Sequence, residues 1–150
     1  MPRILTVQFP TNALAWSISP EPSTEQKKFL DLLVTHNTFN PIQQMWTIIY
    51  EGKSKNSSDN AGAILTQLVG YGEAHVTQAG KFIYLIGAKG KKCWFYRFKK
   101  GDLIETTSMS LSATGAVLFK DSGLALEFDI QTDQNTIVLL LGYIFNNPPT

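Results

Sequence analysis

The spacing of apolar and polar residues changes several times along the chain, and each change predicts a new element. After Ser23, apolar residues recur at the spacing of one helix face, and Gln26 completes a capping box with Ser23. Pro41 disfavours helical geometry at Asn40. The first strong pattern therefore predicts a helix over about residues 23–36.

The next segment carries large, β-branched or aromatic side chains at both odd and even positions. Residues 45–50 have the sequence Met-Trp-Thr-Ile-Ile-Tyr, which is typical of a strand covered on both faces. The run stops at Glu51, and a polar loop follows. We therefore predict a central buried strand that ends at a charged residue.

Helical spacing returns over residues 61–78, where four apolar side chains share one face. Gly62, Gly70 and Gly72 lie inside this segment. Each glycine weakens a helix by up to about 1 kcal/mol relative to alanine. We therefore expect another part of the protein to approach this helix closely.

The rest of the chain is predicted to be mainly strands. Two aromatic-rich runs, residues 81–86 and 92–98, flank a short loop with two glycines, which is typical of a β-hairpin. Polar residues from Thr132 can cap a final helix that runs through Phe145. Further strands are expected over residues 103–111, 116–119 and 124–130.

Alternation of helices and strands around one buried strand predicts an α/β (α+β) fold, with a central mixed β-sheet flanked by helices. Four prolines divide residues 1–22 into short apolar stretches, such as 4–7 and 14–18, which we interpret as edge strands of an N-terminal arm. Residues 23–145 then form a single domain, and residues 146–150 form a frayed tail.

Length and composition exclude several classes of protein. The 150 residues carry a formal net charge of +1 and 11% aromatic residues, which fits one globular domain and argues against disorder. Cys93 is the single cysteine, so a disulfide scaffold is excluded. We see neither a membrane-length apolar run nor the apolar core of a signal peptide. We therefore expect a soluble, intracellular protein, cytoplasmic or nuclear, with no membrane partner.

The candidate chemistry lies at the end of the most apolar strand. Glu51 and Lys53 are two residues apart, so in a strand both side chains point to the same face. A carboxylate is an oxygen ligand suited to Mg²⁺, and a lysine can orient a water or stabilise developing negative charge. The pair could therefore serve phosphodiester hydrolysis, although a lone Glu-x-Lys also arises often by chance.

The order of these features resembles the PD-(D/E)XK nuclease superfamily, which has the restriction-endonuclease-like fold. The resemblance runs from the helix near Ser23, through the strand that ends in Glu-Gly-Lys, to the aromatic hairpin that ends near Phe98. It implies a metal-dependent nuclease that hydrolyses phosphodiester bonds of DNA or RNA, with Mg²⁺ or Mn²⁺ as the cofactor.

The resemblance also implies roles for individual residues. Glu51 would be a metal ligand, the backbone carbonyl of Gly52 would supply another oxygen, and Lys53 would serve the attacking water. Gln67 would match the glutamine that some branches of the superfamily carry on the helix after the motif.

The chain departs from the family pattern upstream of Glu51. The family carries an aspartate about ten residues earlier, and Asn40 occupies that stretch here. Three explanations are open. Asn40 is a neutral and weaker metal ligand, an acid is recruited from elsewhere, or the chain is a catalytically inactive module that binds or interacts within a larger protein or complex. The candidate acids are Glu25, Asp31 and Asp59.

Basic residues are interleaved with the aromatic residues of the hairpin. Such a patch would neutralise the phosphate backbone of a nucleic acid. The aromatic side chains either stack on bases or form the core of the hairpin. A β-rich binding domain, in which Glu-Gly-Lys is only a turn, is a further alternative. The residues expected to contact nucleic acid are Lys55, Lys89, Lys91, Lys92 and Arg97.

Overall fold

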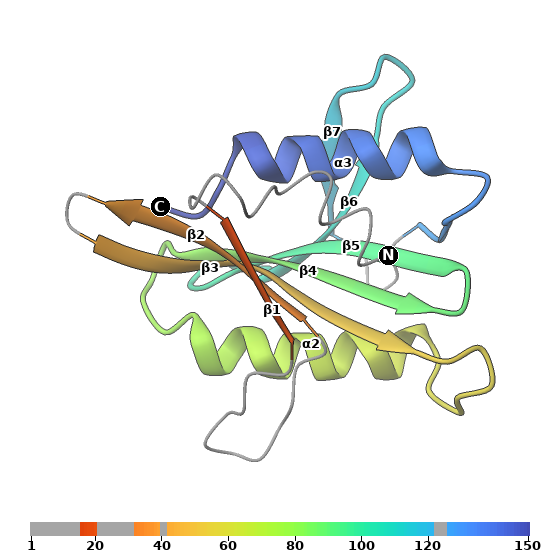
Figure 1. The fold of residues 1–150 in the computed structure, drawn as a ribbon, viewed down its shortest axis with the longest axis horizontal. Coiled ribbons are helices and arrows are strands. Elements are labelled where there is room, and N and C mark those ends of the chain that lie inside the picture. The colour runs from red at the N-terminus through yellow and green to blue at the C-terminus, as the bar shows by residue number, and fades with distance from the viewer. Residues whose placement is uncertain (1–15, 21–31, 40–41, 122–125) are drawn as a thin grey trace.

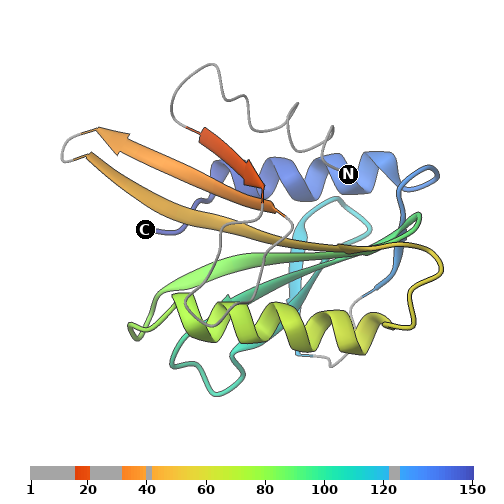
Figure 2. The ribbon, with the colours of Figure 1, turned by 60° about the horizontal axis from the view of Figure 1, so that its bottom comes forward.

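The computed structural model describes residues 16–20, 32–39, 42–121 and 126–150. They form a mixed β-sheet with one helix on each face (Figures 1 and 2). The elements are β1 (Trp16–Pro20), β2 (Leu32–Phe39), β3 (Ile42–Lys53), α2 (Ala61–His75), β4 (Phe82–Lys89), β5 (Lys92–Lys99), β6 (Thr106–Leu111), β7 (Val117–Lys120), β8 (Phe128–Asp129) and α3 (Gln134–Asn146).

The strand order in the sheet follows the chain from β1 to β7, and β8 pairs with β5. Strands β3 and β4 are parallel, and the other pairs are antiparallel. A parallel pair needs a crossover connection, which α2 provides. The carboxyl ends of β3 and β4 therefore meet at one edge of the sheet, where Lys53 pairs in register with Lys89.

The central strand predicted over residues 45–50 is confirmed as part of the longer strand β3, which also includes Glu51 and Lys53. The mixed sheet flanked by helices is confirmed as well. Ile48 and Tyr50 belong to the hydrophobic cluster beneath α3, whereas Ile49 belongs to the cluster beneath α2. Burial on both faces explains why apolar side chains occupy successive positions of β3.

The helix predicted over residues 61–78 is confirmed for residues 61–75, which form α2. The close approach expected at its glycines occurs at Gly72, which lies against β5. A Cβ atom at Gly72 would lie 3.1 Å from Cγ of Phe98. The neighbouring strand β4 makes similar room, because a Cβ atom at Gly87 would lie 2.7 Å from Cγ2 of Ile64. These two glycines let α2 lie directly against the sheet.

The helix predicted over residues 23–36 is wrong for residues 32–36, which belong to β2, antiparallel to β3. Leu33 packs in the α2 cluster and Val34 in the α3 cluster. A strand inside the sheet buries both side chains, whereas a helix buries only one stripe. Residues 23–31, including the predicted cap, lie outside the described residues.

The remaining predictions are confirmed with changed limits. The hairpin is β4 and β5, and the final helix is α3. The strand expected from Leu103 starts at Thr106, and the strand expected over 124–130 is reduced to β8, with 124–125 outside the described residues. Residues 16–18 of the predicted stretch 14–18 belong to β1, whereas residues 4–7 lie outside the described residues.

Residues 146–150 do not form the frayed tail that we expected. Asn146 is the last residue of α3, and Pro149 is buried. The Tyr84 hydroxyl donates to the backbone carbonyl of Asn147 at 2.6 Å. Throughout the described ranges, neither helix has the length and apolar character that crossing a bilayer requires.

Candidate functional site

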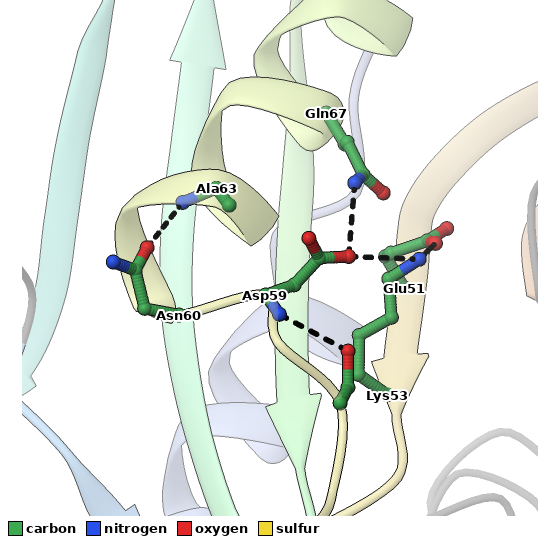
Figure 3. A network of polar contacts seen from close by, with 7 residues as sticks. Glu51, Lys53, Asp59, Asn60, Ala63 and Gln67 are labelled. Carbon is green, nitrogen blue, oxygen red and sulfur yellow. Dashed lines mark hydrogen bonds and ion pairs between the residues drawn. The ribbon is translucent and has the colours of Figure 1, made fainter.

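The candidate site lies at the carboxyl end of β3, on the face of the sheet that α2 covers. Glu51 and Lys53 both point to this face, as their spacing predicted (Figure 3). Nζ of Lys53 lies 3.0 Å from Oε1 of Glu51. The Glu51 side chain is only 5% exposed and that of Lys53 is 25% exposed. Removing a carboxylate from water is costly unless a cation compensates it, so Lys53 stabilises the buried Glu51.

A second carboxylate joins this pair from the loop before α2. Oδ2 of Asp59 lies 3.5 Å from Nζ of Lys53, and Nε2 of Gln67 donates to the same oxygen at 3.4 Å. The Lys53 ammonium therefore lies near both Glu51 and Asp59 (Figure 3). Asp59 is one of the three acids that the sequence offered in place of the missing upstream aspartate; Glu25 and Asp31 lie outside the described residues.

Local structure explains why Asp59 occupies this place. Asn60 caps α2, because its side-chain oxygen accepts a hydrogen bond from the backbone N–H of Ala63 at 2.9 Å. The backbone N–H of Asp59 donates to Oγ of Ser57 at 3.1 Å. Gln67 projects from the second turn of the same helix toward Asp59 (Figure 3). The start of α2 thus holds Asp59 from both sides.

Electrostatics keep Lys53 cationic. The hydrogen bond to Glu51 raises the pKa of the Lys53 ammonium above its ordinary value, and Asp59 adds to this effect while burial opposes it. A lysine in this state has no free lone pair with which to remove a proton from water. Its chemical capacity is to neutralise negative charge and to donate hydrogen bonds.

The donor set fits a hard divalent cation in part. Carboxylate and amide oxygens are the ligands that Mg²⁺ prefers, and Glu51, Asp59 and Gln67 supply these groups. Across the described residues, no three His, Cys, Asp or Glu side chains are placed so that together they could hold a metal ion. A cation held here would therefore keep several water ligands, which is usual for Mg²⁺.

Two further ligand predictions are not tested. Asn40 lies outside the described residues. Gly52 pairs in register with Ala88 of β4, and the carbonyls of a paired strand lie in the plane of the sheet rather than on its face. Metal contacts by Asn40 and by the Gly52 carbonyl stay predictions.

Four of the five residues expected to contact nucleic acid gather in one groove beside this site. The groove has a volume of about 570 Å³ and adjoins the first residues of α2. We call it the lysine groove; its basic residues are Lys55, Lys89, Lys91 and Lys92.

The lysine groove also contains two acids, Glu127 and Asp129. Glu127 lies 3.2 Å from Nζ of Lys92. Among the described residues, Lys55, Lys89 and Lys91 form no salt bridge. The groove therefore carries a local excess of positive charge, although the chain as a whole has a formal net charge of only +1.

Arg97, the fifth expected contact, lies elsewhere. Its guanidinium carbon is 3.8 Å from the centroid of the Phe119 ring, and Phe119 packs against the α3 cluster. This geometry is a cation–π contact between β5 and β7. The structure does not bring Arg97 to the lysine groove.

The aromatic residues of β5 form the core of the protein. Trp94, Phe95, Tyr96 and Phe98 are all at most 5% exposed, so they present no free ring on which a base could stack. Of the two interpretations of the aromatic hairpin, packing is the one the structure supports.

The sequence predicts most residues of this site, but it does not identify all of the acidic residues that the structure brings there. The spacing of Glu51 and Lys53 and the helical position of Gln67 were readable signals. Asp59 could be named only as one candidate, because the loop between β3 and α2 has no periodicity. Glu127 and Asp129 were missed, since they reach the groove only through the pairing of β8 with β5.

Comparisons with known proteins assign no family. No family model matches the chain, and searches of the curated proteins and of the solved structures gave no significant match. Any function must therefore be argued from the residues themselves.

Proposed function

We propose that the chain is a metal-dependent phosphodiesterase of the restriction-endonuclease-like type that acts on DNA or RNA. The observation that carries this proposal is the convergence of Glu51, Lys53 and Asp59 next to the lysine groove. A buried anion, a second acid and an ammonium are groups that metal-dependent phosphodiester hydrolysis can use. They stand at the carboxyl edge of a parallel strand pair, where ligands bind in many α/β proteins.

Each residue has a defined task in this proposal. The Glu51 and Asp59 carboxylates would hold Mg²⁺ or Mn²⁺, and Gln67 would orient Asp59. When bound, the ion would activate a water and stabilise charge on the phosphate. The Lys53 ammonium would hold that water by a hydrogen bond and neutralise negative charge as it develops on the phosphate oxygens.

The lysine groove would hold the substrate backbone. Four ammonium groups next to Glu51 and Asp59 attract phosphates whatever the base sequence, and such binding weakens as salt rises. The restriction-endonuclease-like assignment is supported by the order of a buried strand ending in Glu-Gly-Lys, a crossover helix and a parallel strand. Asp59 would take the place of the missing upstream aspartate.

The direct test is cleavage of supercoiled plasmid and of single-stranded RNA with Mg²⁺, Mn²⁺ or EDTA. We expect cleavage only with metal, and we expect Glu51→Gln and Asp59→Asn each to lower the rate by about 100-fold or more. Glu73→Gln is the matched control, because Glu73 is exposed on α2. Equal cleavage by all four proteins would refute the assignment of the site.

Lys53→Met separates metal binding from catalysis. The single Lys53 ammonium offsets part of the charge of both carboxylates. Its removal leaves two negative charges with no cation between them, which favours binding of a divalent ion. We expect calorimetry to show tighter Mn²⁺ binding by Lys53→Met and weaker binding by Asp59→Asn, while both variants lose cleavage. Weaker Mn²⁺ binding by Lys53→Met would contradict this arrangement of charges.

A second candidate is a non-catalytic module that binds polyanions on the same fold. The observation in its favour is that the Lys53 ammonium already forms ion pairs with the Glu51 and Asp59 carboxylates. This function predicts no cleavage under any condition, together with salt-dependent nucleic-acid binding. That binding should be lost in Lys89→Glu and kept in Lys120→Glu, which changes an exposed lysine of β7 outside the lysine groove.

A further inference from the structure

A second groove on the molecule has a different chemical character. It has a volume of about 600 Å³ and lies between α2 and the loop that joins β5 to β6. We call it the acidic groove; its lining residues are Leu65, Asp102, Leu103, Ile104, Glu105, Thr106 and Asp121. It shares no residue with the lysine groove. It also shares none with the polar group at the end of β3, which we call the Glu51 cluster and which consists of Glu51, Lys53, Asp59 and Gln67.

The groove exposes apolar side chains. Leu103 is fully exposed and Ile104 is 44% exposed, and Leu65 of α2 is half-buried beside them. Single exposed apolar residues are common on protein surfaces, whereas contiguous apolar patches with a polar rim are typical of interaction sites.

Backbone hydrogen bonds hold the ends of the loop that carries these residues. The Lys99 N–H donates to the Glu105 carbonyl at 2.7 Å, which closes the loop at its base. The Lys100 N–H donates to the Lys81 carbonyl at 2.8 Å, and the Gly80 N–H donates to the Lys100 carbonyl at 2.9 Å. These hydrogen bonds fix both ends of the loop from which Leu103 and Ile104 project.

The charge of the groove identifies its occupant. Asp102 and Glu105 form only exposed ion pairs, at 3.4 Å with Lys99 and at 3.7 Å with Lys100. Asp121 forms no salt bridge within the described residues. Exposed pairs contribute little, so cationic groups of a partner can replace these lysines at low cost.

We propose that the acidic groove docks a basic amphipathic segment of a partner protein. Apolar side chains of the segment cover Leu65, Leu103 and Ile104, and its lysines or arginines meet Asp102, Glu105 and Asp121. A nucleic acid is a poor occupant because the three carboxylates repel its phosphates. A second copy of this chain is also a poor occupant, because the lysine groove offers cations without exposed apolar side chains; its Trp94 is only 5% exposed.

The test is fluorescence anisotropy with labelled synthetic peptides and the full 150-residue chain. The probe is a Leu/Lys peptide with leucines at helical positions i, i+3, i+4 and i+7, and its two controls are a Leu/Glu peptide of the same pattern and a scrambled Leu/Lys peptide. We expect the protein to bind the amphipathic Leu/Lys peptide and neither control peptide. The affinity should be at least tenfold lower for Leu103→Ser/Ile104→Ser and for Asp121→Lys. It should also fall in high salt.

Leu139→Ser is the matched variant, because Leu139 is an exposed leucine on α3 outside the groove. Equal affinity of all variants, or a loss with Leu139→Ser alone, would overturn the proposal. The proposal would also be overturned if Leu103→Ser/Ile104→Ser abolished self-association in light scattering or duplex DNA binding while peptide binding stayed unchanged. None of these measurements depends on nuclease activity.

Discussion

Cys93 illustrates how the position of a single side chain decides its chemistry. It lies in β5, it is fully buried, and burial raises the pKa of its thiol to about 12. Because the thiolate is the nucleophilic form of cysteine, a thiol with this pKa is inert near neutral pH. Cys93 lies inside the run 92–98 that is predicted as a strand, and a cysteine inside a strand is more often a buried inert thiol than a nucleophile.

The inertness of Cys93 can be measured directly. At pH 8 we expect iodoacetamide to leave the native protein unlabelled over hours and to label it within minutes in guanidinium chloride, as followed by mass spectrometry. Rapid labelling of the native protein would show that β5 opens readily or that the thiol is accessible.

A second residue-scale prediction concerns the hydroxyl of Tyr84, which links β4 to the end of α3 through the Asn147 carbonyl. Tyr84→Phe removes this hydrogen bond and leaves the ring in place. We expect the free energy of unfolding to fall by about 1 kcal/mol, as measured by urea denaturation. Tyr143→Phe is the control, because the Tyr143 ring packs edge-on against Phe119 and keeps this contact. Equal losses would contradict a specific role for the hydroxyl of Tyr84.

At the scale of elements, the contact between α2 and the sheet depends on close approach rather than on large side chains. Ile64 and Leu68 of α2 both lie over Gly87 of β4. This contact fixes the position of α2 against the sheet. It therefore also positions Asp59, which directly precedes Asn60, the N-cap of α2. A change at Gly87 therefore affects both stability and the candidate site.

Gly87→Ala tests this contact. The new Cβ would lie 2.7 Å from Cγ2 of Ile64 and 3.3 Å from Cδ1 of Leu68, so we expect a loss of about 1–3 kcal/mol of stability. Gly142→Ala in α3 is the matched control, because its Cβ would meet nothing within 4 Å. Alanine is the better helix former, so this control should be neutral or stabilising by up to about 1 kcal/mol. Thermal denaturation followed by circular dichroism distinguishes the two outcomes.

At the scale of the whole molecule, two hydrophobic clusters share one sheet. The cluster beneath α2 and the cluster beneath α3 both draw on β3, β4 and β5. The same three strands lead to the Glu51 cluster and the lysine groove. Neither helix can therefore lose its packing without disturbing the strands that support the other.

This sharing predicts cooperative unfolding. Leu68 of α2 and Leu140 of α3 are both fully buried, and replacing either by alanine should cost about 2–5 kcal/mol. We expect each variant to shift a single transition that is the same by circular dichroism and by tryptophan fluorescence. Two separate transitions in either variant would show that the two faces of the sheet fold independently.

The sequence by itself determined the elements whose apolar pattern is strong and local. A continuous apolar run predicted β3, regular spacing predicted α2, and two aromatic runs around glycines predicted the hairpin. The side-chain alternation of a strand also placed Glu51 and Lys53 on one face. These features depend on neighbours within a few residues, so the sequence contains the information that defines them.

Only the tertiary structure decided which distant groups meet. Residues 32–36 form a strand because the sheet buries Leu33 and Val34 on opposite faces. The spacing of apolar residues along the chain does not reveal this gain in burial. Asp59 joins Glu51 and Lys53 because the crossover returns the chain to the same edge of the sheet. Four lysines from the loop after β3 and from the β4–β5 hairpin share one groove. Arg97, in contrast, lies against Phe119 of β7. Contacts between residues far apart in sequence depend on how the strands are ordered and packed, which local propensities do not specify.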